Sequence, residues 1–308
     1  MTLLAERVKA RAAELGFVAC GVTDLAPNAH ADAFDRWLAA GYAGAMRYLH
    51  RQAAKRKDPA RIVPRARRAV VVLENYYHAD TPATRHPPRV AKYARGADYH
   101  TITLRRLRAL AGFLRSEGAT VAHAWVDDGP VPERELARRA GLGWIGKNAM
   151  LIRPGIGSFC FIGTVFTDLL LAVDEPFTAE HCGSCTRCLD ACPTGAFPEP
   201  GVVDATRCIS YLTIEHAGPI PPELADRLDG WAFGCDTCND VCPWNERFAR
   251  ETDVAEFADR RPLAGVTVEA LDRMSDGEFS DRFGGTPLTR PGREGLARNL
   301  LAAGSRRE

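Results

Sequence analysis

The sequence predicts a layered domain of α/β or α+β class, followed by a cysteine-rich module and a short helical C-terminus. Two observations lead to this fold class. Up to about residue 175, apolar runs of strand length alternate with segments of helical periodicity. Eight of the ten cysteines then lie between residues 182 and 242, where both closely spaced runs end in Cys-Pro. We therefore expect three regions, at 1–175, 176–250 and 251–308.

The first 75 residues predict two helices and two strands. Leu3–Leu15 has the spacing of an amphipathic helix that ends at Gly16, and Phe17–Val22 is a short apolar strand. Phe34–Leu38 is expected to be helical. Val70–Leu73 is an unbroken apolar run of the kind found in strands that are buried on both faces, so we expect it at the centre of the sheet.

The second half of the layered domain begins with a helix over Tyr99–Glu117, in which leucines recur at helical spacing until Gly118 ends the helix. Val121–Val126 is a strand that carries Asp127 at its end. The remaining predicted elements are a helix at Pro132–Ala140, strands at Ala149–Ile152 and Phe159–Phe166, and a helical appendage at Phe279–Glu308 whose last helix is Arg293–Ala303.

The cysteine spacing indicates iron-sulfur clusters. Cys182, Cys185 and Cys188 are each separated by two residues, and Cys192 follows after three more with Pro193 behind it, as in bacterial ferredoxins. In that pattern the fourth cysteine binds a different cluster, so a second cluster is expected. By this crossover rule the ligands are Cys182, Cys185, Cys188 and Cys242 for one cluster, and Cys192, Cys208, Cys235 and Cys238 for the other.

Zinc sites and disulfides account for the cysteines less well. Zinc sites use paired Cys-x-x-Cys but give no reason for a three-cysteine run with Cys-Pro endings. Disulfides between thiols this closely spaced would be strained, and nothing in the chain suggests secretion. Cys20 and Cys160 lie in apolar segments and are interpreted as buried packing residues.

Charge is unevenly distributed along the chain, although the net charge is only +1. Residues 47–108 contain sixteen Lys or Arg and four Asp or Glu, and the rest of the chain is acidic. The sequence has no signal peptide, no twin-arginine motif and no apolar segment long enough to span a membrane. We therefore expect a soluble monomer of the reducing cytoplasm, without a membrane partner.

Two segments suggest a site but also permit a purely structural interpretation. Asp127-Asp128-Gly129-Pro130 follows a strand, where α/β proteins place catalytic carboxylates, yet either aspartate could instead cap the next helix. Gly141–Asn148 has glycines that permit close approach of a ligand. It lacks the strand-and-helix context of a nucleotide motif, however, and could be a plain turn.

Several motifs, taken in order, resemble the epoxyqueuosine reductase family. They are Val-Asp127-Asp-Gly-Pro, Arg-Ala-Gly-Leu-Gly-Trp-Ile-Gly-Lys147-Asn148, the Cys182 run ending in Cys-Pro-Thr-Gly-Ala196, Arg207-Cys208-Ile-Ser210-Tyr-Leu-Thr-Ile-Glu215, and Gly-Cys235-Asp-x-Cys238 with Cys242-Pro243-Trp244-Asn245. The likeness covers nearly the whole chain. It implies an enzyme that removes the epoxide oxygen from the modified wobble base of a tRNA anticodon, giving queuosine, and that uses cobalamin and two [4Fe-4S] clusters.

The resemblance also implies a cobalamin-binding layered domain and roles for individual residues. Asp127 is expected to donate a proton over the corrin face, with its pKa raised by burial. Thr103 replaces the glycine of the Asp-x-His-x-x-Gly signature of other cobalamin proteins, so His100 is not expected to bind cobalt. The expected cobalamin contacts are Asp98, Tyr99, His100, Asp127, Lys147, Leu151, Ser210, Cys235 and Asp236.

The resemblance supplies partners as well. An external donor of flavodoxin or ferredoxin type, or a chemical reductant, would send electrons through the clusters to give cob(I)alamin. Arginine-rich loops with interleaved tyrosines suit the phosphates and splayed bases of an anticodon stem-loop, although a solvated surface is the alternative. The tyrosines are Tyr48, Tyr76, Tyr77, Tyr93 and Tyr99.

Two alternative functions fit the sequence less well. A cobalamin-dependent reductive dehalogenase shares the expected cofactors, but the missing export signal and membrane anchor disfavour it, and its small substrate gives the basic region no use. A non-catalytic iron-sulfur electron carrier would need neither a preceding domain of this size nor the Asp127 segment.

Overall fold

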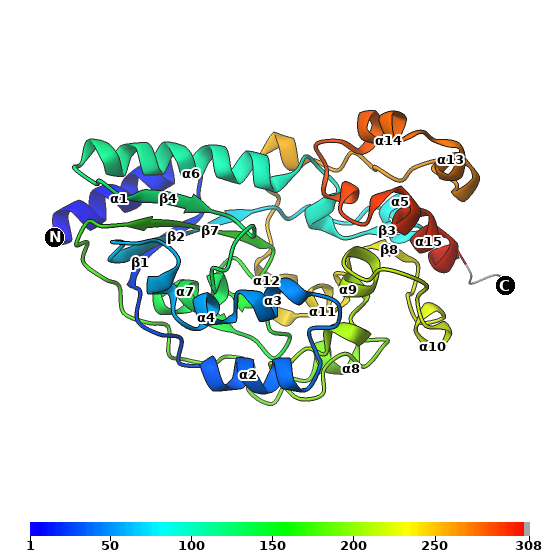
Figure 1. The fold of residues 1–308 in the computed structure, drawn as a ribbon, viewed down its shortest axis with the longest axis horizontal. Helices are drawn as coiled ribbons and strands as arrows, with labels where there is room; N and C mark the ends of the chain where they lie inside the picture. Colours follow the sequence, from blue (N-terminus) through cyan, green and yellow to red (C-terminus); the bar gives the residue numbers. More distant parts are fainter. Residues whose placement is uncertain (305–308) are drawn as a thin grey trace.

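The computed structural model describes residues 1–304 and contains the predicted layers (Figure 1). In this part of the chain the main sheet has four strands in the order β1-β2-β7-β4, and each neighbouring pair is antiparallel. The layered domain is therefore of the α+β class, one of the two classes predicted. Its strands are β1 (Ala19–Asp24), β2 (Arg68–Asn75), β7 (Cys160–Thr167) and β4 (Ala122–Trp125).

The central strand is β2, as its unbroken apolar run predicted. The four residues Val70–Leu73 are each at most 1% exposed. Alternate side chains of this run pack on opposite faces, two with α1 (Thr2–Glu14) and α6 (Tyr99–Ser116), and two with α7 (Glu133–Arg139). One strand thus contributes to both apolar cores of the domain, with α1 and α6 on one side of the sheet and α7 on the other (Figure 1).

One predicted strand lies elsewhere. The Ala149–Ile152 segment does not join the main sheet, because β6 (Leu151–Ile152) pairs with β5 (Trp144–Ile145) in a separate hairpin. Cys20 and Cys160 pack at the edges of the two cores, and burial raises the pKa of each thiol to about 12. Their interpretation as packing residues agrees with this position.

Residues from the first predicted region extend into the other two. The short strand β3 (Arg89–Val90) pairs in parallel with β8 (Trp231–Phe233) of the cysteine-rich module. Val90 also shares an apolar core with the C-terminal helices, which are α13 (Val268–Arg273), α14 (Asp276–Phe283) and α15 (Gly292–Gly304). The predicted last helix corresponds to α15, and the end of the predicted appendage, 305–308, lies outside the described residues.

The remaining helices are short. The layered domain adds α2 (Ala31–Ala39), α3 (Arg47–Arg51), α4 (Ala53–Lys57) and α5 (Pro82–Arg85). The cysteine-rich module consists of loops and α8 (Arg187–Asp190), α9 (Ile209–Ile214), α10 (Pro222–Ala225), α11 (Thr237–Asp240) and α12 (Pro243–Phe248). Among residues 1–304, no helix combines the length and apolar character needed to cross a membrane.

Candidate active site

Cys182 and Cys185 lie in a surface loop, and Cys188 lies in the first turn of α8, which follows that loop. The residues between them are exposed, whereas the three cysteines are half-buried. Cys242, which precedes α12, is 7% exposed. Burial and charge repulsion from Cys182, Cys242 and Cys185 raise the pKa of Cys188. The four thiols are therefore close enough to interact, and we call this group the outer site.

Cys192, Cys208, Cys235 and Cys238 form a second group, which we call the inner site. Burial raises the pKa of Cys208, Cys235 and Cys238, and the charges of other thiols in the group raise it further. The pKa of Cys235 reaches about 12. The charge of Cys188 also acts on Cys238, so the outer and inner sites are neighbours.

The thiols fit the donor set of iron-sulfur clusters. Backbone N–H groups of Ser210 and Tyr211 donate to Cys208, and Cys242 likewise receives two N–H bonds from the start of α12, which favours the thiolate forms. Within residues 1–304, no group of three or more His, Cys, Asp or Glu side chains is spaced to hold a single metal ion. Four thiols around a four-iron cluster are more widely spaced than four thiols around one ion.

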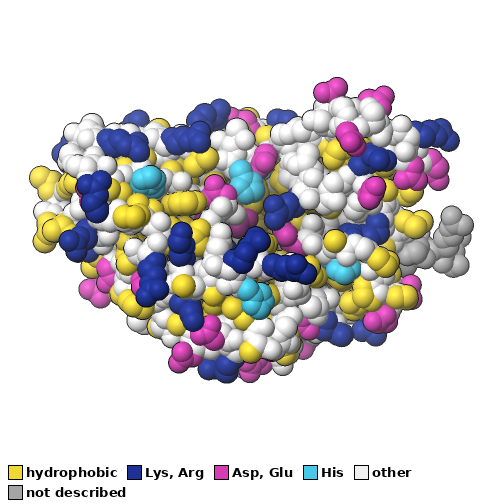
Figure 2. All heavy atoms as spheres, viewed as in Figure 1, with side chains coloured by type: hydrophobic (Ala, Val, Ile, Leu, Met, Phe, Trp, Pro, Cys, Tyr) yellow, Lys and Arg dark blue, Asp and Glu magenta, His cyan; other side chains and the backbone are white. Residues whose placement is uncertain are grey.

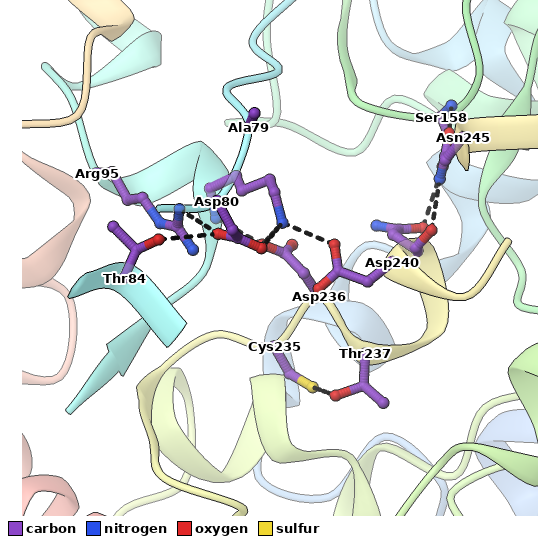
Figure 3. Close-up of polar contacts among 12 residues, drawn as sticks. Ala79, Asp80, Thr84, Arg95, Ser158, Cys235, Asp236, Thr237, Asp240 and Asn245 are labelled. Carbon is purple, nitrogen blue, oxygen red and sulfur yellow. Dashed lines mark hydrogen bonds and ion pairs between the residues drawn. The ribbon is translucent and has the colours of Figure 1, made fainter. Parts of the chain in front are cut away.

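A buried ionic network lies beside the inner site (Figure 3). Lys92 is 3% exposed, and its ammonium donates to Asp80 (2.9 Å) and Asp240 (2.6 Å). The backbone N–H of Lys92 donates to Asp236 Oδ2 (2.6 Å), and Arg95 donates to Asp80 (2.7 Å). Burial lowers the pKa of Lys92, but the carboxylates outweigh it and raise the pKa. Asp236, 2% exposed, is thus engaged in this network.

The loop that carries Asp127 has a strained backbone that tertiary contacts hold in place. Asp127 has φ 49°, in the left-handed region that costs a residue other than glycine on the order of 1 kcal/mol. Tyr99 Oη donates to Asp127 Oδ2 (2.5 Å), and the Asp127 N–H donates to Glu133 Oε1 (2.8 Å). Arg56 Nη2 donates to the carbonyl oxygen of Gly129 (3.0 Å). Three separate elements therefore fix the position of this loop.

The structure distinguishes the two adjacent aspartates, which their position after the strand did not. Burial and the charge of Asp127 raise the pKa of Glu133 well above its ordinary value, and Glu133 Oε1 accepts from the Asp127 backbone. Asp128 instead lines a hollow of about 270 Å³ between α6 and β4, together with Arg108 and His123. Asp127 is exposed in this structure, contrary to its expected burial, but it is the aspartate whose side chain a residue of α6 holds in place.

Tyr93 connects the Asp127 loop with the inner site. Its ring centroid lies 6.0 Å from that of Tyr99 and 6.2 Å from that of Phe233, which lies two residues before the inner-site Cys235. Burial raises the pKa of Tyr93, and the charges of Asp127 and Asp236 raise it further. The predicted site residues Tyr99, Asp127 and Asp236 therefore all lie near Tyr93.

Asp98 and His100 form a pair at the start of α6. Asp98 Oδ1 accepts from the His100 N–H (2.9 Å) and lies 2.8 Å from His100 Nδ1. Burial lowers the pKa of His100, but the hydrogen bond and charge of Asp98 outweigh it and raise the pKa. Thr103 is fully buried and donates to Glu74, so the threonine at this position contributes a polar contact inside the core.

Two predicted cobalamin contacts are engaged elsewhere. Lys147 Nζ donates to the carbonyl oxygens of Gly183 (2.7 Å) and Cys185 (3.0 Å) in the outer-site loop. Leu151 is 6% exposed and packs in an apolar core with Leu142. Lys147 thus lies at the outer site, and Leu151 lies in an apolar core.

Comparisons with known proteins identify the family. Residues 56–128 match the family described as "Epoxyqueuosine reductase QueG, DUF1730", and residues 181–245 match the "4Fe-4S double cluster binding domain". The chain is 43% identical over 303 residues to the epoxyqueuosine reductase of Pseudomonas aeruginosa, which covers 96% of this chain and 84% of the relative. The chain belongs to the epoxyqueuosine reductase family.

Solved structures of this family have the same fold. A crystal structure of epoxyqueuosine reductase with an epoxyqueuosine-modified tRNA-Tyr stem loop matches with a TM-score of 0.86 at 30% identity, covering 98% of this chain and 80% of that one. A Bacillus subtilis epoxyqueuosine reductase whose aspartate catalytic loop is swung out of the active site matches at 0.84 and 29%, covering 98% and 81%. The predicted fold class is confirmed, and the chain is an oxidoreductase that reduces epoxyqueuosine to queuosine.

In this member of the epoxyqueuosine reductase family, part of the basic region lies across one face of the molecule, over α3 and α4 (Figure 2). One expectation about that region is wrong. Tyr76 and Tyr99 are each 6% exposed, and Tyr76 packs against Phe161 with ring centroids 4.4 Å apart, so neither tyrosine is available to stack on RNA bases. The exposed basic side chains between residues 47 and 68 are Arg47, Arg51, Lys55, Arg61, Arg65 and Arg67.

Sequence reasoning missed three residues that organise this epoxyqueuosine reductase site. Arg56 was counted only within the basic region, although its guanidinium holds the Asp127 loop. Glu133 lies in the first turn of α7, where an acidic residue is ordinary, so its sequence position gives no signal. Lys92 could have been suspected, because it stands alone among apolar and small residues, and lysines are buried only when paired.

Proposed function

We propose that this chain reduces epoxyqueuosine at the wobble position of a tRNA anticodon, in the cytoplasm, with cobalamin and two [4Fe-4S] clusters. The reaction takes up two electrons and two protons, converts the epoxide into an alkene and releases its oxygen as water. The observation that carries the proposal is the contact chain from Asp127 through Tyr99 and Tyr93 to the inner site.

The outer site would hold one cluster and the inner site the other. This assignment is supported by two groups of four interacting thiols with N–H donors beside them. Because the outer loop is exposed, an external donor of flavodoxin or ferredoxin type would deliver electrons there. The proximity of Cys188 to Cys238 supports their passage to the inner site.

Cobalamin, when bound, supplies a strong reductant for the epoxide. The residues that would hold it surround the junction of the Asp127 loop with the inner site. Arg56 Nε supports this position, because it is buried without a hydrogen-bond partner among residues 1–304 and could donate to a peripheral amide of the corrin. The proposed contacts are Asp98, His100, Asp127, Ser210 and Cys235, whereas Tyr99, Asp236, Lys147 and Leu151 are less available because their side chains are buried or engaged elsewhere.

Asp127 would donate a proton to the departing oxygen. The hydrogen bond from Tyr99 orients its Oδ2, and the strained backbone is of the kind that clusters at functional sites. The aspartate catalytic loop of the Bacillus subtilis enzyme, which is swung out of the active site in one structure, supports a catalytic role for the corresponding loop here.

The exposed basic face would bind the anticodon stem-loop. Arg47, Arg51 and Lys55 lie on or beside α3 and α4, close in sequence to Arg56, which contacts the Asp127 loop. Phosphate neutralisation by such side chains supplies most of the sequence-independent affinity for RNA. The related enzyme that was crystallised with a tRNA stem loop supports this partner.

The test is a nucleoside analysis by mass spectrometry. Epoxyqueuosine-containing tRNA is incubated anaerobically with protein reconstituted with iron, sulfide and cobalamin, and with a chemical reductant. We expect epoxyqueuosine to disappear and queuosine to appear in equal amount. Omission of cobalamin should abolish the conversion, and full conversion without it would contradict the cofactor assignment.

A further inference from the structure

The Gly141–Asn148 segment, for which the sequence allowed either a ligand loop or a turn, contains β5 and part of the turn that joins it to β6 in a hairpin. A Cβ atom at Gly143 would lie 2.2 Å from the carbonyl oxygen of Ile152, and one at Gly146 would lie 2.5 Å from Ile152 Cδ1. The close approach of the two strands therefore explains these two glycines.

This hairpin directs two polar side chains at the outer site. Trp144, 2% exposed, donates its indole N–H to Cys182 Sγ (3.4 Å). Lys147 Nζ donates to the carbonyl oxygens of Gly183 (2.7 Å) and Cys185 (3.0 Å). An indole N–H and an ammonium group from the layered domain thus reach the loop that carries Cys182 and Cys185, two of the four outer thiols.

The surroundings of Trp144 are apolar and aromatic. It packs with Cys242, the fourth outer thiol, and its ring lies 5.8 Å from Phe177, 5.0 Å from His181 and 4.9 Å from Trp244, measured between centroids. In such a low-dielectric environment a hydrogen bond to a charged acceptor is stronger than in water.

We propose that Trp144 and Lys147 set the reduction potential of the cluster at the outer site, a role that rests on the cluster assignment proposed above. One-electron reduction adds a negative charge to a cluster, and both an N–H···S bond and a nearby ammonium stabilise that charge. The two side chains therefore raise the potential of the outer cluster. A higher potential makes this cluster a better acceptor for electrons from an external donor.

The test compares two tryptophans in the same aromatic group. Trp144→Phe removes the N–H and keeps an aromatic ring, whereas Trp244→Phe removes an N–H that donates to the carbonyl oxygen of His181 (3.4 Å). Redox titrations monitored by EPR are carried out on cluster-loaded protein without cobalamin. We expect Trp144→Phe to lower one of two midpoint potentials, by about tenfold in the equilibrium constant or ~59 mV for one electron. Trp244→Phe should leave both unchanged.

Lys147 provides a second measurement, which decides the matter if Trp144→Phe does not assemble its cluster. Lys147→Met should lower the same midpoint potential, and Lys147→Arg, which keeps the charge, should restore it. Unchanged potentials in Lys147→Met and Trp144→Phe, or an equal shift in Trp244→Phe, would overturn the proposal. Wild-type protein that fails to bind two clusters would overturn the proposed function as well, whereas intact clusters with unmoved potentials overturn this inference alone.

Discussion

The outer and inner cysteine sites each have four thiols but different surroundings. The residues between Cys182 and Cys188 are exposed, and a hairpin of the layered domain supplies hydrogen bonds to that loop. At the inner site, Lys92 is 3% exposed and contacts three carboxylates, including Asp236 and Asp240 on the cysteine-bearing segment itself. The same ligand chemistry is therefore placed once at the surface and once beside a buried charge network.

This difference separates two tasks. An exposed loop gives an electron donor access, and small changes there adjust a potential without disturbing the fold. A buried network must be fully paired, because an unpaired charge in the interior is costly. Lys92 adjoins Tyr93, whose ring contacts Tyr99, so the inner network also fixes the distance between the inner site and the Asp127 loop.

The largest effect on turnover is expected at Asp127, whose loop is connected to the inner site through Tyr99 and Tyr93. Asp127→Asn keeps the size of the side chain but removes the acidic proton, so turnover should fall by about 10²- to 10⁴-fold. Iron, sulfide and cobalamin content should remain at wild-type levels, because no cysteine is affected. The measurement is the initial rate of queuosine formation.

Asp128→Asn is the matched control, because Asp128 lines the separate hollow beside α6. Its turnover should stay within about twofold of wild type, as for most surface substitutions. Equal losses in the two variants would contradict the assignment of the proton donor to Asp127.

The next prediction compares one lysine from each site. Lys92→Met leaves the carboxylates of Asp80, Asp236 and Asp240 without their common cation and should destabilise the protein by about 3–5 kcal/mol. Lys147→Met removes an ammonium that bonds backbone carbonyls near the surface, with an expected cost of about 1 kcal/mol or less. Anaerobic urea unfolding of the cluster-loaded variants measures both. Equal destabilisation would remove the distinction between a buried and an open site.

The sequence predicted those features that depend on local patterns. The Val70–Leu73 run identified the central strand, and the cysteine spacing predicted which thiols would be neighbours. The surroundings of the clusters depend instead on contacts between distant segments. Lys92 and Asp240 are 148 residues apart in sequence, and Arg56 and Gly129 are 73 residues apart. No spacing rule connects such pairs.

The tyrosines of the basic region show a second limit. Tyr76 follows β2 directly and lies within the basic region 47–108, whose overall composition suggested a surface position. Its ring turns inward onto Phe161 of β7, a strand that pairs with β2. Whether an aromatic ring in a basic region faces solvent is decided by the strand that lies next to it, which the local sequence does not contain.

A smaller effect on turnover is expected at Arg56, which belongs to the basic region and contacts the Asp127 loop. Arg56→Ala removes the hydrogen bond to the Gly129 carbonyl oxygen, so kcat should fall by about three- to fivefold. Arg56→Lys, which keeps a donor, should recover part of the lost kcat. Arg61→Ala, an exposed change in the same basic region, should raise KM for tRNA and leave kcat unchanged, because it removes a charge and an exposed ion pair with Asp58 but no bond to the Asp127 loop. A rise in KM alone for Arg56→Ala would mean that Arg56 acts on RNA rather than on the loop.

The smallest effect is expected at His100, which faces the charges of Asp98, Asp127 and Asp128 and stacks on Tyr99 with ring centroids 4.1 Å apart. Burial lowers the pKa of His100, but the interaction with Asp98 raises it by more. The pKa of His100 in the folded protein therefore lies above its ordinary value near 6.5. The Asp98 interaction therefore stabilises the fold fully below about pH 6.5, and this contribution is lost as pH rises through the folded pKa. NMR of labelled histidine should show that Asp98→Asn lowers the pKa of His100, with His100→Gln used to assign the signal. If the pKa of His100 is unchanged in Asp98→Asn, then Asp127 and Asp128, rather than the N-cap residue Asp98, hold the proton on His100.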